Sequence, residues 1–196
     1  MQAEHDTRGT LRAWLGRTYV YGTSSAQLAA RHEGNVAPAV LTPAYAACAA
    51  AFLTRTRWAV PATVVGLAIG TRRIHQALPS APRPIAMRVA ASGLLWALRQ
   101  EAALLLRHWW PLALAAAPTS KLLRRAILSA VVVDTLTALH EHRPVSFRDA
   151  LVVATGRRLD DTAYGAGLWS GAMSARSWAC LLPRRRALGH LPKNRQ

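Results

Sequence analysis

Hydrophobic residues are gathered into long charge-free runs, and the charged residues lie between these runs. The two clearest runs, at 36–54 and 58–71, each end at a pair of arginines or at arginines two residues apart. A helix needs about 20 apolar residues to cross a bilayer, with a usual range of roughly 17–25. The first run reaches this range and the second falls short, so the pattern predicts two apolar helices of which only the first has the length of a span.

We interpret residues 36–73 as a helical hairpin that either crosses a membrane or dips into it, with Arg55 and Arg57 at its bend. Trp58, beside the bend, is suited to anchor the hairpin at the membrane surface. Pro43 follows a threonine, and this pair favours the start of a helix. A helix that begins at Pro43 would be shorter than a span. The alternative interpretation is a buried hairpin in a soluble helical protein.

The rest of the chain also has helical periodicity. A first helix is predicted from Leu11 to about His32, and an amphipathic helix at 85–110. The charges of the second helix are frequent, which favours a position at the membrane interface or against the hairpin over a free span. Ser120 is predicted to cap a further helix that runs to about His140.

Polar residues define the start and the surroundings of the last helices. Ser146 and Asp149 have the spacing of a capping box. Asp134 interrupts an apolar run, and because an ionised carboxylate is costly in hydrocarbon we expect it to pair with an arginine. There is no internal repeat and no convincing strand pattern. We therefore predict an all-α fold, a membrane-associated helical module with a helical hairpin and amphipathic interfacial helices.

The charge of the chain points to a membrane surface. The net charge is +16, and of 25 basic residues only Lys121 and Lys193 are lysine. The arginines lie singly or in pairs at the ends of apolar runs, which favours phosphate headgroups over a nucleic-acid-binding stripe. Residues 1–10 are not a secretory signal, and Cys48 and Cys180 form no disulfide framework. We expect a protein at the cytoplasmic face of the cell membrane, with membrane lipid and no nucleic acid as a partner.

The most polar chemistry lies where two of the nine acidic residues, Asp160 and Asp161, follow Arg157 and Arg158. On one helix Arg157 is placed to pair with both aspartates and Arg158 with Asp161, and each pair contributes about 0.2–0.5 kcal/mol. In the alternative interpretations, one aspartate caps a new helix, or the four side chains converge on a polar ligand such as a sugar or a diphosphate.

Other motifs indicate packing more than chemistry. Ala163, Gly167 and Gly171 recur every four residues and give one helix face that allows close approach of a second helix. His140 and His142 are two residues apart and so lie on different faces, unlike the histidine pair of a helical zinc site. The sequence has no glycine-rich phosphate loop and no GxSxG motif. We predict no catalytic and no metal-binding residue in this chain.

Two segments, one near each end of the chain, carry a resemblance to a known family. The first contains Trp14, Arg17, Tyr21, Gly22, Thr23, Ser24, Arg31 and His32, and the second contains Arg158, Asp160, Asp161, Tyr164, Gly165 and Trp169. Their order and spacing around an apolar middle resemble the mycofactocin-system glycosyltransferases, a branch of the family 2 inverting glycosyltransferases. By this resemblance, these residues are family-signature positions or contacts to the acceptor.

The resemblance implies a membrane-associated enzyme that transfers glucose from UDP-glucose, with the help of a divalent metal, to a peptide-derived redox cofactor. In that family an α/β catalytic domain with metal-binding aspartates precedes the Tyr-Gly-Thr-Ser segment. This chain has no such domain, so we expect it to be the C-terminal membrane portion from a truncated or split gene, inactive alone. The catalytic domain would then be on the same or another chain.

We predict three parts of the chain. Residues 1–35 form an N-terminal helix that resembles the end of a glycosyltransferase catalytic region, residues 36–182 form the membrane-associated module, and residues 183–196 form a basic disordered tail. The alternative function is that of a small non-enzymatic membrane scaffold, which would capture a partner through the bare face at Gly167 and Gly171.

Overall fold

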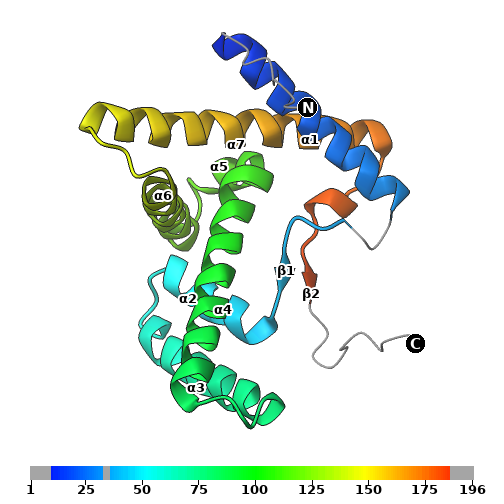
Figure 1. Ribbon diagram of the computed structural model, residues 1–196. Coiled ribbons are helices and arrows are strands. Elements are labelled where there is room, and N and C mark those ends of the chain that lie inside the picture. Colours follow the sequence, from blue (N-terminus) through cyan, green and yellow to red (C-terminus); the bar gives the residue numbers. More distant parts are fainter. Residues whose placement is uncertain (1–9, 33–35, 186–196) are drawn as a thin grey trace, which may run out of the picture.

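The computed structural model describes residues 10–32 and 36–185, and these residues form a helical protein (Figure 1). The helices are α1 (Leu11–Arg31), α2 (Pro43–Leu53), α3 (Ala59–Ala77), α4 (Arg83–Ala103), the π-helical turn η1 (Leu104–His108), α5 (Trp110–Ala116), α6 (Lys121–His142), α7 (Phe147–Ala175) and the 3₁₀ turn η2 (Ala179–Leu181). The strands β1 (Val40–Leu41) and β2 (Arg184–Arg185) have two residues each and pair in parallel. The prediction of an all-α fold is confirmed for this part of the chain.

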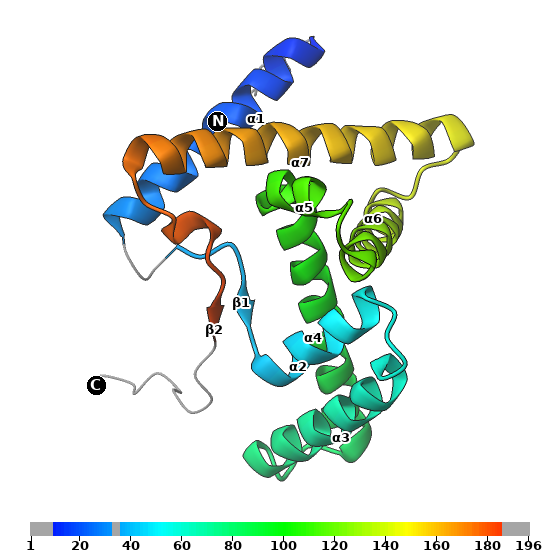
Figure 2. The same cartoon turned by 180° about the vertical axis from the view of Figure 1, so that it is seen from behind.

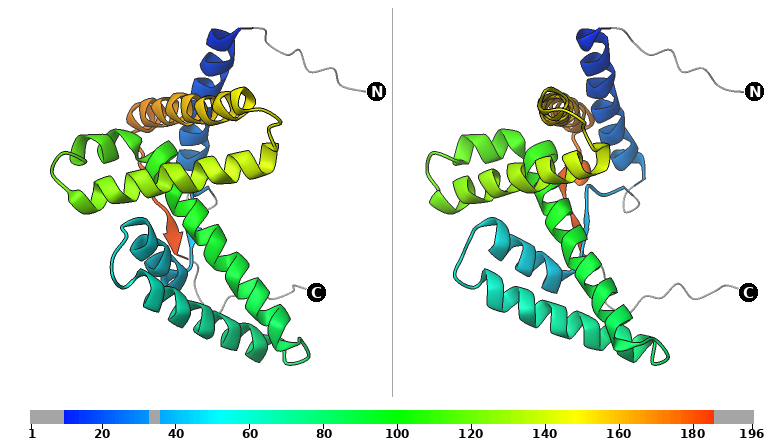
Figure 3. Two further views of the ribbon diagram at one scale, coloured as in Figure 1. Left: turned by 90° about the vertical axis from the view of Figure 1, so that its left-hand side faces the viewer. Right: turned by 60° about the vertical axis from the view of Figure 1, so that its left-hand side comes forward.

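The helices form two groups joined by one long helix (Figures 1 and 2). α1 crosses α7 at one end of the molecule, and the α2–α3 hairpin lies at the other end. α4 runs between the two groups, packs on both helices of the hairpin and reaches α7 through η1. α6 lies between α7 and the hairpin (Figure 3). α4 and α6 therefore connect the two ends of the fold.

Local sequence explains where three of these helices begin. Thr10, Ser120 and Ser146 each accept a hydrogen bond from the backbone N–H three residues ahead, at 3.3, 3.2 and 3.1 Å. These side chains satisfy N–H groups that the first helical turn leaves free. Ser146 also donates to the Asp149 carboxylate at 2.6 Å, so the predicted capping interaction is present. α7 then continues without a break, and Asp160 and Asp161 lie in its interior.

The predicted hairpin is confirmed, with Arg55 in its bend in the left-handed region at φ 52°. Arg55 Nε donates to Ser129 Oγ of α6 at 2.9 Å and so ties the bend to the next layer. Pro43 occupies the first turn of α2, which has only 11 residues and is too short to cross a bilayer. Tyr45 of α2 fits against Gly93 of α4, where a Cβ would lie 2.8 Å from its ring, and this close fit docks the hairpin on α4.

The helix with the length and composition of a membrane span differs from the expected one. Among the described residues, only Arg83–His108 meets both criteria. The sequence pattern assigned this helix to the interface because of its charges and favoured the run at 36–54 instead. Pro43 shortens that run, whereas η1 extends α4 without a break to His108.

The core consists mainly of small side chains, and many large apolar side chains point outward. Ala26, Ala90, Ala102 and Ala130 are fully buried or nearly so, and Leu53 and Leu168 are the largest fully buried side chains among the described residues. In contrast, Val60 of α3 is 74% exposed, Leu95 of α4 66% and Leu136 of α6 61%. Small side chains between the helices let their backbones approach closely, and the larger apolar side chains lie on the outside of α3, α4 and α6.

The glycine face of α7 packs on α1. A Cβ at Gly167 would overlap the Tyr19 carbonyl, and a Cβ at Gly171 would lie 2.7 Å from the Thr23 carbonyl oxygen. Gly22 of α1 makes the matching approach to the backbone of α7. The predicted close packing at this face is therefore confirmed, and the partner helix belongs to the same chain.

Two expectations fall wholly or partly outside the described residues. The boundary predicted after residue 35 lies at the gap at 33–35, and most of the tail predicted at 183–196 lies beyond residue 185. Within the described part of that tail, the backbone N–H of Arg184 donates to the Ala39 carbonyl at 2.9 Å. This contact joins the segment that follows η2 to the segment that precedes α2.

Candidate functional site

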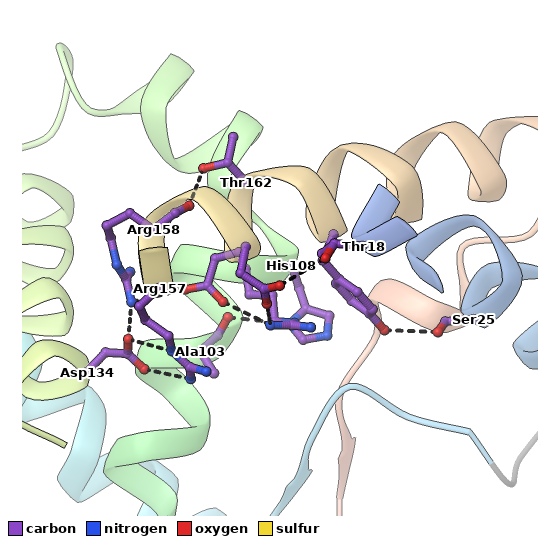
Figure 4. A network of polar contacts seen from close by, with 12 residues as sticks. Thr18, Ser25, Ala103, His108, Asp134, Arg157, Arg158 and Thr162 are labelled. Carbon is purple, nitrogen blue, oxygen red and sulfur yellow. Dashed lines mark hydrogen bonds and ion pairs between the residues drawn. The ribbon is translucent and has the colours of Figure 1, made fainter. Parts of the chain in front are cut away.

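Charged side chains from three helical elements meet beside α7 and form one polar network (Figure 4). This arginine–aspartate cluster consists of Arg107 from η1, Asp134 from α6, and Arg157, Arg158, Asp160 and Asp161 from α7. Residues three and four apart share a face of a helix, so α7 can direct two arginines and two aspartates toward its neighbours. Three guanidinium groups face three carboxylates, and the formal charges of the cluster cancel.

Asp134 is the most buried member of the cluster, with 2% of its surface exposed. Arg157 donates to it from Nε and from Nη2 at 3.1 Å each, which is a bidentate contact. Arg158 Nη2 donates to the same carboxylate. An unpaired carboxylate at this depth would be strongly unfavourable. The prediction that Asp134 pairs with an arginine is confirmed, and the structure supplies two.

The adjacent aspartates share Arg107, and each has one further partner. Arg107 Nη1 donates to Asp160 Oδ2 at 2.9 Å and to Asp161 Oδ1 at 3.1 Å. Arg158 makes the predicted contact to Asp161 at 3.0 Å. Thr18 of α1 donates to Asp160 Oδ1 at 3.1 Å. Both aspartates are thus tied to elements outside α7, and neither caps a helix.

The predicted pairing of Arg157 with Asp160 and Asp161 is wrong. Arg157 bonds to Asp134 instead, because that buried carboxylate presents both oxygens to its guanidinium. The hydrogen bond to Asp134 raises the pKa of Arg157. Burial raises the pKa of Asp161, while Arg158, Arg157 and Arg107 lower it in part. Since each carboxylate of the cluster already accepts from a guanidinium, the cluster positions helices and offers no free general base.

Tyr164, one of the signature residues, links the cluster to α1. The Arg107 guanidinium lies over the Tyr164 ring, 3.9 Å from its centroid, which is cation–π geometry. The Tyr164 hydroxyl donates to Ser25 Oγ at 3.0 Å (Figure 4). Arg107 was not among the predicted site residues. It is one of several charges in the amphipathic helix predicted at 85–110, and its spacing to α7 in the sequence gives no sign of the contact.

Gly165 and Trp169 hold α7 against η1 and α5. A Cβ at Gly165 would overlap the Arg107 carbonyl and approach Trp110 Nε1 to 2.5 Å, so only glycine fits there. Trp169 Nε1 donates to the His108 carbonyl at 2.7 Å. Both signature residues therefore act in helix packing.

Trp14 lies at a small cavity beside the cluster. Its ring is the neighbour of Gly156, at 3.9 Å from a Cβ built there, and the cavity of about 270 Å³ is also lined by His142, Arg157 and Asp160. The cavity is therefore the place where signature residues from both segments, Trp14 and Asp160, meet open space.

The remaining signature residues lie on α1 or at its end. Thr23 Oγ1 donates to the Gly167 carbonyl at 3.2 Å, across the crossing with α7. Ser24 bonds within α1, and Tyr21 is exposed. Arg17 lines a different shallow cavity near the start of α1. The exposed signature residues at the end of α1 are Arg31 and His32. The structure does not bring these last residues together with the cluster.

Comparison with known proteins gives the family of these segments. The pre-mycofactocin glycosyltransferases of two Mycobacterium tuberculosis strains, CDC 1551 / Oshkosh and ATCC 25618 / H37Rv, are each 36% identical to this chain over 187 residues, which cover 92% of it. This chain is related to the pre-mycofactocin glycosyltransferases. It spans 40% of the length of each of these relatives. No protein-family model and no solved structure matches the chain.

The resemblance to glycosyltransferases implies a divalent metal, which His, Cys, Asp or Glu side chains would have to bind. Among the described residues, no group of three or more His, Cys, Asp or Glu side chains is arranged to hold one. The three cluster carboxylates face guanidinium groups, and Glu141, between the two histidines, pairs with Arg99 at 2.5 Å. The described residues therefore do not fit the metal that the resemblance implies.

The alternative function, a scaffold that captures a partner through the glycine face of α7, required that face to be free. α1 covers Gly167 and Gly171 within the same chain. Replacing Gly167 by a larger residue would therefore disturb the fold itself and would report on α1–α7 packing rather than on partner capture.

Proposed function

We propose that this chain is the helical, membrane-associated portion of a pre-mycofactocin glycosyltransferase. One observation carries the proposal, the 36% identity to curated pre-mycofactocin glycosyltransferases over 92% of the chain. In this role the chain anchors the enzyme at the cytoplasmic face of the cell membrane. Its lipid partner contacts the large apolar side chains that α3, α4 and α6 present outward.

The membrane role rests on the distribution of side chains. Exposed valines and leucines on α3, α4 and α6 would be unfavourable in water, by about 25 cal/mol for each Å² of apolar surface. The arginines at the ends of the apolar runs can contact phosphate headgroups. A hydrocarbon surface with a basic border suits this pattern better than water does.

Hexosyl transfer itself belongs, in this proposal, to a catalytic domain on the same or another chain. That domain would bind UDP-glucose and the divalent metal, because the three carboxylates of the arginine–aspartate cluster are neutralised by arginines. The chain would support the domain through the face of α7 and α1 that carries Trp14 and Asp160, where the small cavity opens.

The catalytic part of the proposal is tested with purified protein, UDP-glucose, Mn²⁺ and the pre-mycofactocin acceptor. We expect no glucosylated product from the chain alone. This chain spans 40% of the length of the M. tuberculosis relative, which leaves 60% (100% − 40%). Product should appear when that remaining part of the relative is co-expressed with this chain. Turnover by the chain alone would show that catalysis does not lie elsewhere.

The membrane part is tested by flotation with vesicles of phosphatidylglycerol and phosphatidylcholine, followed by carbonate extraction. We expect the chain to float with the vesicles and to remain with them in carbonate. A protein that stays soluble and binds DNA with an affinity that falls steeply with salt would instead support the nucleic-acid interpretation.

A further inference from the structure

A groove lies between α3 and α4, at the end of the molecule opposite to the crossing of α1 and α7 (Figure 3). Its volume is about 500 Å³, within the range of about 300–1,000 Å³ that is usual for small-molecule sites. The residues that line it lie three or four positions apart on each helix, so each helix contributes one face. No member of the arginine–aspartate cluster lines this groove.

The polar and apolar lining residues lie at different ends of the groove. The basic ones lie near the connection between the two helices: Arg72, His75 and Arg83. The apolar ones include residues further from that connection: Val64, Leu67 and Met87. Val64 precedes Arg72 by eight positions, which is about 12 Å along the helix. The groove therefore has a basic end beside the connection and an apolar end away from it.

The guanidinium groups at the basic end have no anionic partner among the described residues. Arg72 and Arg83 are exposed, and neither is in an ion pair within this part of the chain. α3 contains no acidic residue, and Glu101 of α4 lies 18 positions from Arg83, about 27 Å along the helix. His75 Nδ1 lies 3.2 Å from the Ala81 carbonyl oxygen, which holds the ring at this end. The basic end is thus complementary to a negative group.

The apolar end of the groove distinguishes a lipid from a small soluble anion. Val64 is 61% exposed and Met87 is 50% exposed. A free phosphate would contact the arginines and leave both of these side chains in water. An acyl chain would cover them, and burial of apolar surface is favourable. A ligand with a negative head and an apolar tail therefore matches both ends.

We propose that this groove binds an anionic phospholipid, with its phosphate at Arg72 and Arg83 and an acyl chain along the apolar end. Guanidinium groups bind phosphate oxygens through charge-assisted hydrogen bonds, and anionic headgroups attract basic residues near the membrane surface. The proposal rests on the membrane association proposed above and adds one defined lipid site to it. It does not depend on glycosyl transfer.

The headgroup contact is tested with the purified full chain in detergent micelles that contain equal amounts of phosphatidylglycerol and phosphatidylcholine. Native mass spectrometry counts the lipids of each kind that stay bound to the protein. The wild type should retain phosphatidylglycerol in preference. Arg72→Gln/Arg83→Gln should weaken phosphatidylglycerol binding by about 25-fold, or about fivefold for each arginine. Arg73→Gln/Arg88→Gln removes the same charge from exposed positions of the same helices outside the groove, and it should bind like the wild type.

The acyl contact is tested at two adjacent valines of α3. Val64 and Val65 are 61% and 56% exposed, but only Val64 lines the groove. Val64→Asn should weaken phosphatidylglycerol binding by about fourfold for each methylene group of the lipid that loses its contact. Val65→Asn makes the same change outside the groove and should bind like the wild type. Glycerol 3-phosphate has the phosphate without an acyl chain, and at equal concentration it should not displace the lipid.

Circular dichroism checks that each variant keeps its helices. Equal effects of the two arginine pairs, or of the two valine variants, would overturn the lipid site. Displacement by glycerol 3-phosphate would overturn it as well, because the arginines would then bind a soluble anion. Vesicle flotation is measured on the same proteins. A chain that floats but shows no preference for phosphatidylglycerol refutes the lipid site alone, whereas a chain that does not float also refutes the membrane association.

Discussion

Asp134→Asn tests whether the arginine–aspartate cluster holds α6 against α7. The substitution keeps the shape of the side chain and removes its charge. Arg157 and Arg158, which both donate to Asp134, would lose the carboxylate that compensates them. Removing one partner of a fully buried ion pair costs about 3–5 kcal/mol.

The two arginines are partly exposed, with 34% and 28% of their side chains accessible, so water can solvate them in part. We therefore expect Asp134→Asn to lower the free energy of unfolding by about 2–3 kcal/mol, below the fully buried range. For a chain of this length, that loss corresponds to a fall in Tm of about 5–10 °C. Thermal unfolding in detergent, followed by circular dichroism, measures it.

Asp149→Asn is the matched control, because it makes the same chemical change at the exposed start of α7. We expect it to cost about 1 kcal/mol or less, the value of a single exposed polar contact. The double variant Asp134→Asn/Arg157→Gln should be less destabilised than the sum of its single changes, with a coupling energy of about 1–3 kcal/mol. Equal effects of Asp134→Asn and Asp149→Asn would refute a structural role for the cluster.

Three further predictions concern the contacts of α7. Gly167→Ala should destabilise the fold by more than about 2 kcal/mol, since its Cβ would overlap the Tyr19 backbone, while Gly16→Ala, at a position with open space, should not; thermal unfolding compares them. Arg107→Lys should lower Tm despite its retained charge, because an ammonium group cannot keep both carboxylate contacts and the stacking on the Tyr164 ring. Trp169→Phe should cost about 1 kcal/mol through the lost hydrogen bond to His108, and its unfolding midpoint in urea measures this loss.

Local signals in the sequence were sufficient to predict the helices but not their contacts. Ser120 and Ser146 are caps because a hydroxyl at the first turn meets a free N–H, and this chemistry involves only neighbouring residues. The contact of Arg107 with Asp160 joins residues 53 positions apart, and no periodicity records it. The need of Asp134 for an arginine was predictable. That Arg157 pairs with Asp134, and not with the aspartates of α7, depends on how α6 and α7 pack.

The membrane prediction shows the same division between composition and three-dimensional context. The charge-free run at 36–54 looked like the best span because hydropathy counts residues and ignores where a helix begins. Pro43 starts α2 late and leaves it with 11 residues. At 85–110 the charges suggested an interfacial helix, yet Arg99 and Arg107 are paired with carboxylates of other helices, so part of that charge is compensated inside the protein. A count of charges along one helix cannot include partners that folding supplies.

The two segments that carry the family resemblance form a single contact in the structure. Thr23 and Gly167 are 144 residues apart, yet they meet where α1 crosses α7, and Gly22 makes a second close approach there. Thr18 and Asp160 join the same pair of helices beside the arginine–aspartate cluster. The small and polar residues at this crossing are therefore explained by close packing and hydrogen bonds between α1 and α7. The two segments also border open space together, at the cavity beside Trp14 that Asp160 lines as well.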